Sequence, residues 1–334
     1  MTDLRTLAIL TVRNEGAFLL EWLAHHRACG FTDFLVFSND CTDGTDLILD
    51  RLAQVGWLTH VRNDGPHVQG PQWAALKAAE AHPLVQSADW VLVCDIDEFV
   101  NIHVGNRTLP ALFAALPQAR AIPLTWRMFG NAGVVQFDDA PVTQTFLRAA
   151  PPVLFWPWRA QMFKTLYRRD AFSKPGVHRP KGTSDGWFDG SGRAMGTGPT
   201  RIISALGQDN GALVQLNHYA LGAMESYLVK CDRGRANREA SAFDLGYWVD
   251  RNFSTAEDRT ILSLDSAPLR QALRNDPVLG PLHDAAVAWR KARFTDLMRN
   301  EDWRALFGRL LMTPPTRLLT PAEARLVWQH GAQA

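Results

Sequence analysis

The first 126 residues alternate short apolar runs with longer amphipathic segments, and this alternation constrains the fold more than any other feature of the chain. The apolar runs predict buried strands, at residues 7–12, 34–37, 58–61, 90–94 and 121–126. The amphipathic segments predict helices, at residues 17–28, 45–55, 71–81 and 109–115. Strands that alternate with helices of this length form parallel βαβ units, in a sheet that helices cover on both faces. We therefore predict an α/β fold with an open, mostly parallel sheet.

The pattern loosens after residue 128. Prolines and glycines between residues 151 and 198 predict long loops, and beyond residue 256 helical segments are separated by prolines. This change in pattern predicts a main domain over residues 1–250 and a helical C-terminal extension over residues 251–334.

Composition and charge exclude several classes of protein. The chain has 334 residues, of which 46% are hydrophobic and 21% charged, an ordinary globular balance. Lys and Arg number 35 and Asp and Glu 34, so the basic excess typical of nucleic-acid-binding proteins is missing, and we expect no nucleic-acid partner. The four cysteines form no CxxC pair, which argues against a disulfide framework or a thiolate zinc site. No signal peptide and no run of 18 apolar residues is recognisable, so we expect a cytoplasmic protein.

Three acidic residues follow the predicted strand at residues 90–94 directly, namely Asp95, Asp97 and Glu98. Ligands of an open parallel sheet bind at the carboxyl ends of its strands. Asp95 and Asp97 are two residues apart, so in extended backbone they would point to the same side. Two carboxylates that face one point suit Mg²⁺ or Mn²⁺. The alternative is a merely solvated acidic strand end, which the adjoining apolar strand disfavours.

Polar residues also follow the first two predicted strands, at residues 13–15 and 39–45. Turn formation and helix capping would account for the segment from Asp43 to Thr45. They do not account for polar residues at three strand ends that should meet at one edge of the sheet. The sequence therefore predicts a binding site at this edge.

Three segments together resemble a known group of enzymes: VRNE at residues 12–15, LLEWLAHHRACGFTDFLVFSNDCTDGT at 19–45 and ADWVLVCDIDEFV at 88–100. They are similar to nucleotide-sugar glycosyltransferases of the GT-A fold, of the family 2 type and the related family 92. A later Asn217-His218-Tyr219 and the residues Tyr227, Lys230, Arg233 and Gly234 extend the resemblance. It implies a GT-A-like mixed sheet, with a donor-binding half at about residues 1–128 and an acceptor half at about 129–250.

The resemblance also implies an activity. It indicates a hexosyltransferase that uses Mn²⁺ or Mg²⁺, takes a sugar from a UDP-sugar and transfers it with inversion to a carbohydrate or glycolipid, as in polysaccharide biosynthesis. Asp95 and Asp97 resemble the motif that binds the metal and the diphosphate, and His218 resembles a late histidine that completes the metal shell. Alone, His218 would more simply be a structural hydrogen-bonding residue.

The resemblance places the nucleoside pocket at the first two strand ends. Relatives often have Asp-Asn-x-Ser where this chain has Ser38-Asn39-Asp40-Cys41, so either Asp40 or Asp43 would contact the nucleoside. The residues expected to bind the nucleotide are Val12, Arg13, Glu15, Asn39, Asp40 and Asp43.

Residues 148–181 contain eight basic residues and one acidic residue. A diphosphate leaving group is stabilised by nearby cations, and we select Lys164 and His178 for this role. Most of the other basic residues would form a solvated face. The aromatic residues Phe155, Trp156 and Trp158 fit a sugar platform and a core equally well.

The catalytic base is expected in the glycine-rich loop at residues 182–198. An inverting transfer needs a group that removes the proton of the acceptor hydroxyl. Asp185 and Asp189 lie in this loop, beside Trp187 and Phe188, and a loop that closes over substrate is a suitable place for such a group. Loop carboxylates are more often simply solvated.

Two other functions are compatible with the same pattern. A nucleotidyltransferase has a similar fold and similar carboxylates, although it usually has a glycine-rich basic loop after the first strand, where this chain has VRNEGAF at residues 12–18. A non-catalytic nucleotide-sugar-binding module is the second alternative. Separately, residues 286–317 carry a basic and aromatic helical stripe, which would either contact an anionic membrane surface or pack on the main domain.

Overall fold

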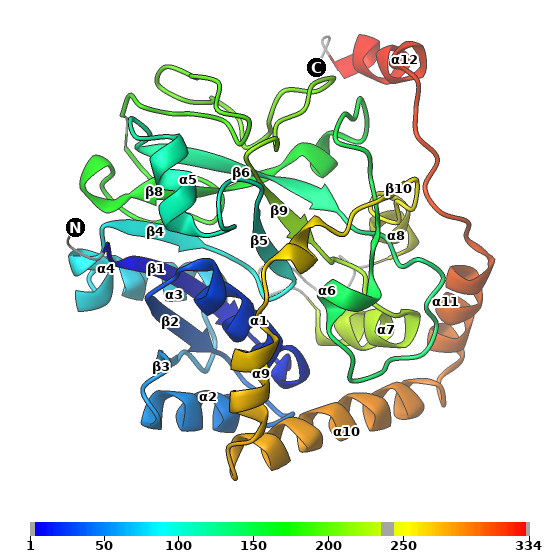
Figure 1. Cartoon of the computed structure of the whole chain (residues 1–334). Helices are drawn as coiled ribbons and strands as arrows, with labels where there is room; N and C mark the ends of the chain where they lie inside the picture. Colours follow the sequence, from blue (N-terminus) through cyan, green and yellow to red (C-terminus); the bar gives the residue numbers. More distant parts are fainter. Residues whose placement is uncertain (1–3, 183, 235–243, 332–334) are drawn as a thin grey trace.

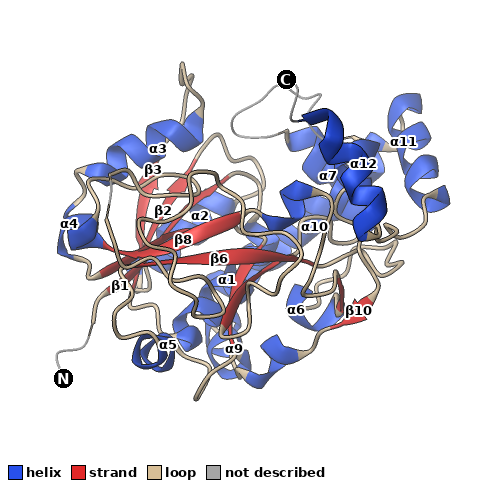
Figure 2. Cartoon of the chain, turned by 90° about the horizontal axis from the view of Figure 1, so that it is seen from above, coloured by secondary structure: helices blue, strands red, loops and turns tan. Residues whose placement is uncertain are grey.

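The computed structural model describes residues 4–182, 184–234 and 244–331 of the chain. Its centre is an eight-stranded sheet with the order β3-β2-β1-β4-β8-β6-β9-β5. The strands are β1 Thr6–Val12, β2 Asp33–Ser38, β3 Thr59–Arg62, β4 Trp90–Val93, β5 Glu98–Ile102, β6 Ala121–Met128, β8 Phe163–Arg168 and β9 Val214–His218. Two short strands, β7 Arg148–Ala149 and β10 Ala256–Glu257, pair separately. Figure 2 shows the strands at the centre of the molecule and helices around them.

The sheet is mixed. β1 pairs in parallel with β2 and with β4, and β2 with β3, as the alternation of strands and helices predicts. β8 then runs antiparallel between β4 and β6, β9 runs parallel to β6, and β5 closes the edge antiparallel to β9. The predicted fold class is confirmed: an α/β fold with a mostly parallel mixed sheet flanked by helices.

The helices of the main part are α1 Gly16–Cys29, α2 Thr45–Gln54, α3 Pro71–Glu80, α4 Pro83–Ser87, α5 Leu109–Ala115, α6 Val142–Thr145, α7 Met224–Arg233 and α8 Leu245–Val249. Alternate side chains of β1 point into two separate cores. Ala8 and Leu10 pack with the apolar residues of α1 and α2, whereas Leu7 and Ile9 pack with those of α3 and α4. The result is three layers, which bury both faces of the sheet.

The C-terminal helices pack on the main domain. They are α9 Ala267–Arg274, α10 Leu279–Leu297, α11 Glu301–Met312 and α12 Pro321–Gly331. α10 runs along the base of the molecule and contacts α1, α2 and α7 (Figure 1). The donor, acceptor and extension boundaries predicted from sequence stay predictions, but the extension is in close contact with both halves.

The amphipathic stripe of α11 faces the protein. Leu310 is buried, and Trp303, Leu306 and Phe307 pack against the core cluster formed by α7 and α8. At the end of the helix Leu311 and Met312 are 51% and 77% exposed. This packing favours the second alternative for residues 286–317, and membrane contact stays a prediction. Within the described ranges, none of the helices has both the length and the apolar character that crossing a membrane requires.

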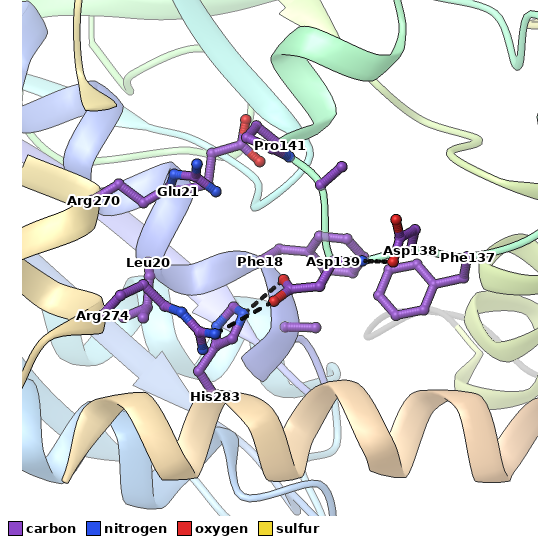
Figure 3. A pocket seen from close by; sticks show the side chains of 12 residues that line it. Phe18, Leu20, Glu21, Phe137, Asp138, Asp139, Pro141, Arg270, Arg274 and His283 are labelled. Carbon is purple, nitrogen blue, oxygen red and sulfur yellow. Dashed lines mark hydrogen bonds and ion pairs between the residues drawn. The ribbon is translucent and has the colours of Figure 1, made fainter. Parts of the chain in front are cut away.

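A hollow of about 380 Å³ lies where α9 and α10 meet α1 and residues 137–141 (Figure 3). His283 and Arg274 point toward Asp139, with His283 Nε2 at 2.8 Å and Arg274 Nη2 at 3.7 Å from its carboxylate. Arg270 lies beside Glu21 across the same hollow. Neither this hollow nor a second one of about 310 Å³ beside β6 is lined by Asp95 or Asp97. We therefore read the first hollow as a junction between the extension and α1.

Burial of His25 in α1 predicts an acid-sensitive fold. His25 Nε2 donates to the carbonyl of Val100 at 2.8 Å, and burial lowers the pKa of His25 from 6.5 to about 4. Between pH 6.5 and pH 4, His25 therefore binds a proton in the unfolded state but not in the folded state. The stability of the fold is unaffected by His25 above pH 6.5 and decreases as the pH falls to 4. We expect the free energy of unfolding to decrease by about 3 kcal/mol over this pH range because of His25.

Urea unfolding of the wild type and of His25→Gln, repeated from pH 7 to pH 4, measures this effect. The wild type should lose stability more steeply than the variant over that interval. The same pH dependence in both proteins would contradict the prediction.

Candidate active site

The acidic segment after β4 forms a turn. Residues 94–97 connect β4 to β5, and the N–H of Asp95 donates to Glu98 Oε2 at 2.9 Å. Asp95 Oδ2 accepts a hydrogen bond from Lys164 Nζ at 2.9 Å, whereas Asp97 Oδ2 accepts one from Lys230 Nζ at 2.6 Å. The extended backbone that the sequence argument assumed is wrong, because residues 96 and 97 form a turn, and the two carboxylates pair with different lysines.

Asp97 faces α7 and the end of β9. Its Oδ2 lies 3.6 Å from His218 Nε2, and β5–β9 pairing places His218 opposite Glu98. Burial alone would raise the pKa of Asp97, but the charge of Lys230 and the nearby ring of His218 hold it well below its usual range. Asp97 is therefore an ionised carboxylate at neutral pH.

The predicted metal ligands come together only in part. No group of three or more His, Cys, Asp or Glu side chains suited to a metal ion occurs among the residues that the structure describes. Asp97 and His218 do lie together. A separation of 3.6 Å is too long for a hydrogen bond, and His218 Nδ1 also lacks a partner among the described residues. Two protein ligands fit a cation whose remaining positions are filled by substrate phosphates and water, as Mg²⁺ commonly binds.

Lys164 lies behind Asp95 in a buried cluster. Its side chain is 0% exposed, and its Nζ also lies 3.8 Å from Glu98 Oε2. Burial alone would lower the pKa of Lys164, but the charges of Asp95 and Glu98 raise it. The predicted direct contact with a diphosphate does not fit this depth. The structure instead indicates that Lys164 positions Asp95, whose side chain is 37% exposed.

Glu98 and Trp126 complete this cluster. Glu98 is 0% exposed and accepts a hydrogen bond from Trp126 Nε1 at 2.7 Å. Burial raises the pKa of Glu98 to about 8. The ring of Trp126 lies 4.4 Å from that of His218 and 5.7 Å from that of His178, measured between centroids. Trp126 is thus the aromatic residue of this site, and no sequence pattern singled it out.

Two of the aromatic residues that fit either a sugar platform or a core make packing contacts. Trp156 contacts Trp328 of α12, with 5.7 Å between ring centroids, and Trp158 lies under the guanidinium of Arg159. These contacts favour a packing role.

The loop after β1 is held by two arginines from distant helices, of which Arg290 is buried and Arg233 partly buried. Glu15 forms ion pairs with Arg233 of α7 and, at 3.3 Å, with Arg290 of α10. Arg233 also donates to the carbonyl of Arg13 at 2.9 Å, and Arg290 Nη1 to that of Asn14 at 3.4 Å. The side chain of Arg13 is exposed, whereas Glu15 is buried. The sequence did not indicate this role of Arg290, because its partner Glu15 lies 275 residues away.

The loop after β2 separates the roles of Asp40 and Asp43. Asp43 is buried, and its carboxylate accepts hydrogen bonds from Gly16 N–H at 3.0 Å and Thr45 N–H at 2.9 Å. It therefore ties the starts of α1 and α2 together. Asp40 is exposed and accepts a bond from Gly65 N–H at 3.2 Å. Of the two alternatives, Asp40 has the carboxylate that a ligand can reach.

Val12 is the last residue of β1, and Asn39 directly follows β2. Both are buried, and Asn39 Oδ1 has no hydrogen-bond partner among the described residues. A buried amide oxygen without a partner is costly unless a ligand or water satisfies it. Asn39 therefore fits its predicted contact with a nucleotide, and Val12 supports the loop through apolar packing.

Asp185 and Asp189 lie away from the acidic turn, which corrects their assignment as catalytic bases. Asp185 is 81% exposed and pairs with Arg120, the residue before β6. Asp189 is 4% exposed, and its carboxylate pairs with Arg193 Nε at 2.8 Å. The adjoining Gly190 carbonyl accepts from Val214, at the opposite end of β9 from His218. Both carboxylates stabilise the loop instead.

His178 reaches the site, but as a neutral ring. Its Nδ1 lies 2.9 Å from the carbonyl of Phe163. Burial and the charge of Lys164 lower the pKa of His178 to about 4. A neutral imidazole does not supply the positive charge that the sequence prediction assigned to it.

Comparisons with known proteins show which family this chain resembles. The model of the family "Glycosyltransferase family 92" matches residues 9–200. A family 92 protein of Oryza sativa subsp. japonica is 25% identical over 172 residues, which are 48% of this chain and 26% of the relative. One of Ricinus communis is 29% identical over 100 residues, 28% of this chain and 16% of the relative. The chain thus spans about a quarter or less of the length of these relatives.

Solved structures show weaker similarity. Residues 1–349 of TarS from S. aureus are 18% identical with a TM-score of 0.33, covering 50% of this chain and 47% of that one. A structure of the same TarS segment in complex with UDP has a TM-score of 0.31. The family model covers more than half of the chain, including the strand ends and the acidic turn. The chain therefore belongs to glycosyltransferase family 92.

Proposed function

We propose that this chain is a glycosyltransferase that moves a hexose from a UDP-sugar to a hydroxyl group of a carbohydrate or glycolipid, with inversion. The observation that carries the proposal is the turn at residues 94–97, whose two carboxylates are held by separate lysines, one buried and one partly buried, at the edge of the sheet. Family 92 membership supports the reaction class.

The residues at this edge of the sheet have different proposed roles. Asp40 and Asn39 are available to the nucleoside. Asp95 presents its carboxylate at the same edge of the sheet. Asp97 and His218 would hold Mn²⁺ or Mg²⁺. When bound, such an ion neutralises charge that develops on the diphosphate. Lys230 keeps Asp97 ionised and in place. Lys164 holds the carboxylate of Asp95 in place.

A panel of nucleotide-sugars, with Mn²⁺ or with EDTA, tests the proposal. Thermal shifts report binding, and product analysis separates sugar transfer from nucleotidyl exchange and from binding without turnover. We expect transfer from a UDP-sugar that requires the metal ion. Asp138→Asn is the matched control, because the side chain of Asp138 is 85% exposed and outside the edge. Nucleotidyl exchange, or UDP binding without any transfer, would contradict the proposal.

The role of the C-terminal extension gives a separate prediction. Arg290→Met should raise the donor KM about tenfold with little change in kcat, because a charged hydrogen bond to the loop is worth about 1.5–3 kcal/mol. Steady-state kinetics with varied donor measure this effect. Arg299→Met is the control, since Arg299 lies in the same region with a side chain that is 80% exposed. Equal donor KM values for the two variants would contradict a positioning role of Arg290.

A further inference from the structure

The proposed transfer needs a proton acceptor, and five carboxylates at the acidic turn or in the glycine-rich loop already have other contacts. Asp95 pairs with Lys164 and Asp97 with Lys230. Glu98 is fully buried against Trp126. Asp185 and Asp189 lie at the far ends of β6 and β9. Each of these carboxylates is thus held by a cation or by burial, and a neutral group with an uncommitted lone pair beside the acidic turn would suit the role of proton acceptor.

His178 has an uncommitted lone pair. A carbonyl oxygen only accepts hydrogen bonds, so the 2.9 Å contact with the Phe163 carbonyl places the ring proton on Nδ1. The neutral ring then carries its lone pair on Nε2. This nitrogen makes no hydrogen bond to another described residue, and the residue is half-buried rather than enclosed. Thr165 Oγ1 donates to the backbone carbonyl of His178 at 2.7 Å, which fixes the segment to β8.

The ring lies on the reaction side of the sheet. Phe163, which orients it, directly precedes Lys164, the partner of Asp95. Trp126 contacts the rings of both His178 and His218. The charged and titratable groups that act on His178 are Lys164, Asp95 and His218. His178 is therefore one aromatic ring away from the Asp97–His218 pair, with its lone pair unused.

We propose that His178 Nε2 is the general base that removes the proton of the acceptor hydroxyl. This inference rests on the proposed function. The acceptor oxygen forms a bond to the anomeric carbon as its proton passes to Nε2. The bond from that carbon to the diphosphate oxygen breaks, and its electron pair leaves with UDP. The imidazolium then returns the proton to solvent, which restores the neutral ring.

Two variants test this role, because they preserve different halves of the ring. The amide of His178→Asn mimics Nδ1 and keeps the contact with Phe163, but it removes Nε2. His178→Gln places an amide near Nε2 that accepts hydrogen bonds but takes up no proton. We expect kcat for transfer to fall at least about 10²-fold in both variants, the usual contribution of a general base. UDP affinity by calorimetry and the unfolding temperature of His178→Asn should stay at wild-type values.

The outcomes separate the possible failures. Retention of more than a third of kcat in His178→Asn would overturn the inference, and so would wild-type activity in His178→Gln. A parallel loss of UDP affinity and kcat would make His178 a binding residue instead, which also overturns it. If the wild type itself binds UDP and transfers no sugar, the proposed function fails, and the inference fails with it.

Discussion

Asp97→Ala should lower kcat for sugar transfer by roughly 10³-fold, which is the largest effect that we expect from a single substitution. Asp97 is the carboxylate of the Asp97–His218 pair, so its loss removes one of the two protein ligands that would hold the metal ion. The substitution should also abolish the stabilisation that UDP gives in the presence of Mn²⁺. Initial rates and thermal shifts with UDP, each measured with Mn²⁺ and with EDTA, check both effects.

A loss of activity through unfolding must be separated from a loss of chemistry. Asp97→Ala removes the carboxylate that pairs with the partly buried Lys230, which by itself costs up to about 3 kcal/mol of stability. The double variant Asp97→Ala/Lys230→Met removes both charges, so we expect it to regain stability but not transfer. Wild-type turnover by Asp97→Ala, or full activity of the wild type in EDTA, would contradict the metal-dependent mechanism.

Lys164→Met should destabilise the protein by about 3 kcal/mol, the lower end for a broken buried ion pair, because Asp95 is partly exposed. It should also slow transfer, though less than Asp97→Ala does, since Asp95 loses the cation that orients it and Glu98 loses a neighbouring positive charge. Urea unfolding measures the first effect and initial rates measure the second.

A double-mutant cycle with Asp95→Asn tests whether Lys164 acts through its ion pair with Asp95. Lys164→Met/Asp95→Asn should recover at least half of the lost stability, because the second substitution removes the uncompensated charge. Activity should not return. If Lys164→Met is as stable as the wild type, or if the two substitutions add without coupling, Lys164 does not position Asp95.

The architecture could be predicted from the sequence because its signal is local. The alternation of apolar runs and amphipathic segments predicted the five strands β1, β2, β3, β4 and β6 and the helices between them. The antiparallel strand β5 was not predicted, because residues 98–102 follow the acidic turn with no separate apolar run before them. The family resemblance was confirmed as well, since its motifs lie in short continuous segments.

The meeting of the polar strand ends at one edge was also determined by the sequence alone, because parallel strands end on the same side of the sheet. The partners of these residues were decided only by the tertiary structure. Lys164 comes from 69 residues away to meet Asp95, and Lys230 from 133 residues away to meet Asp97. A spacing of two residues predicts a common direction only in extended backbone, and the turn at residues 94–97 breaks that condition. Asp189 likewise appears as a free carboxylate in sequence, whereas the folded loop pairs it with Arg193. Side-chain roles here depend on which distant charge reaches each carboxylate, and local periodicity holds no information about that contact.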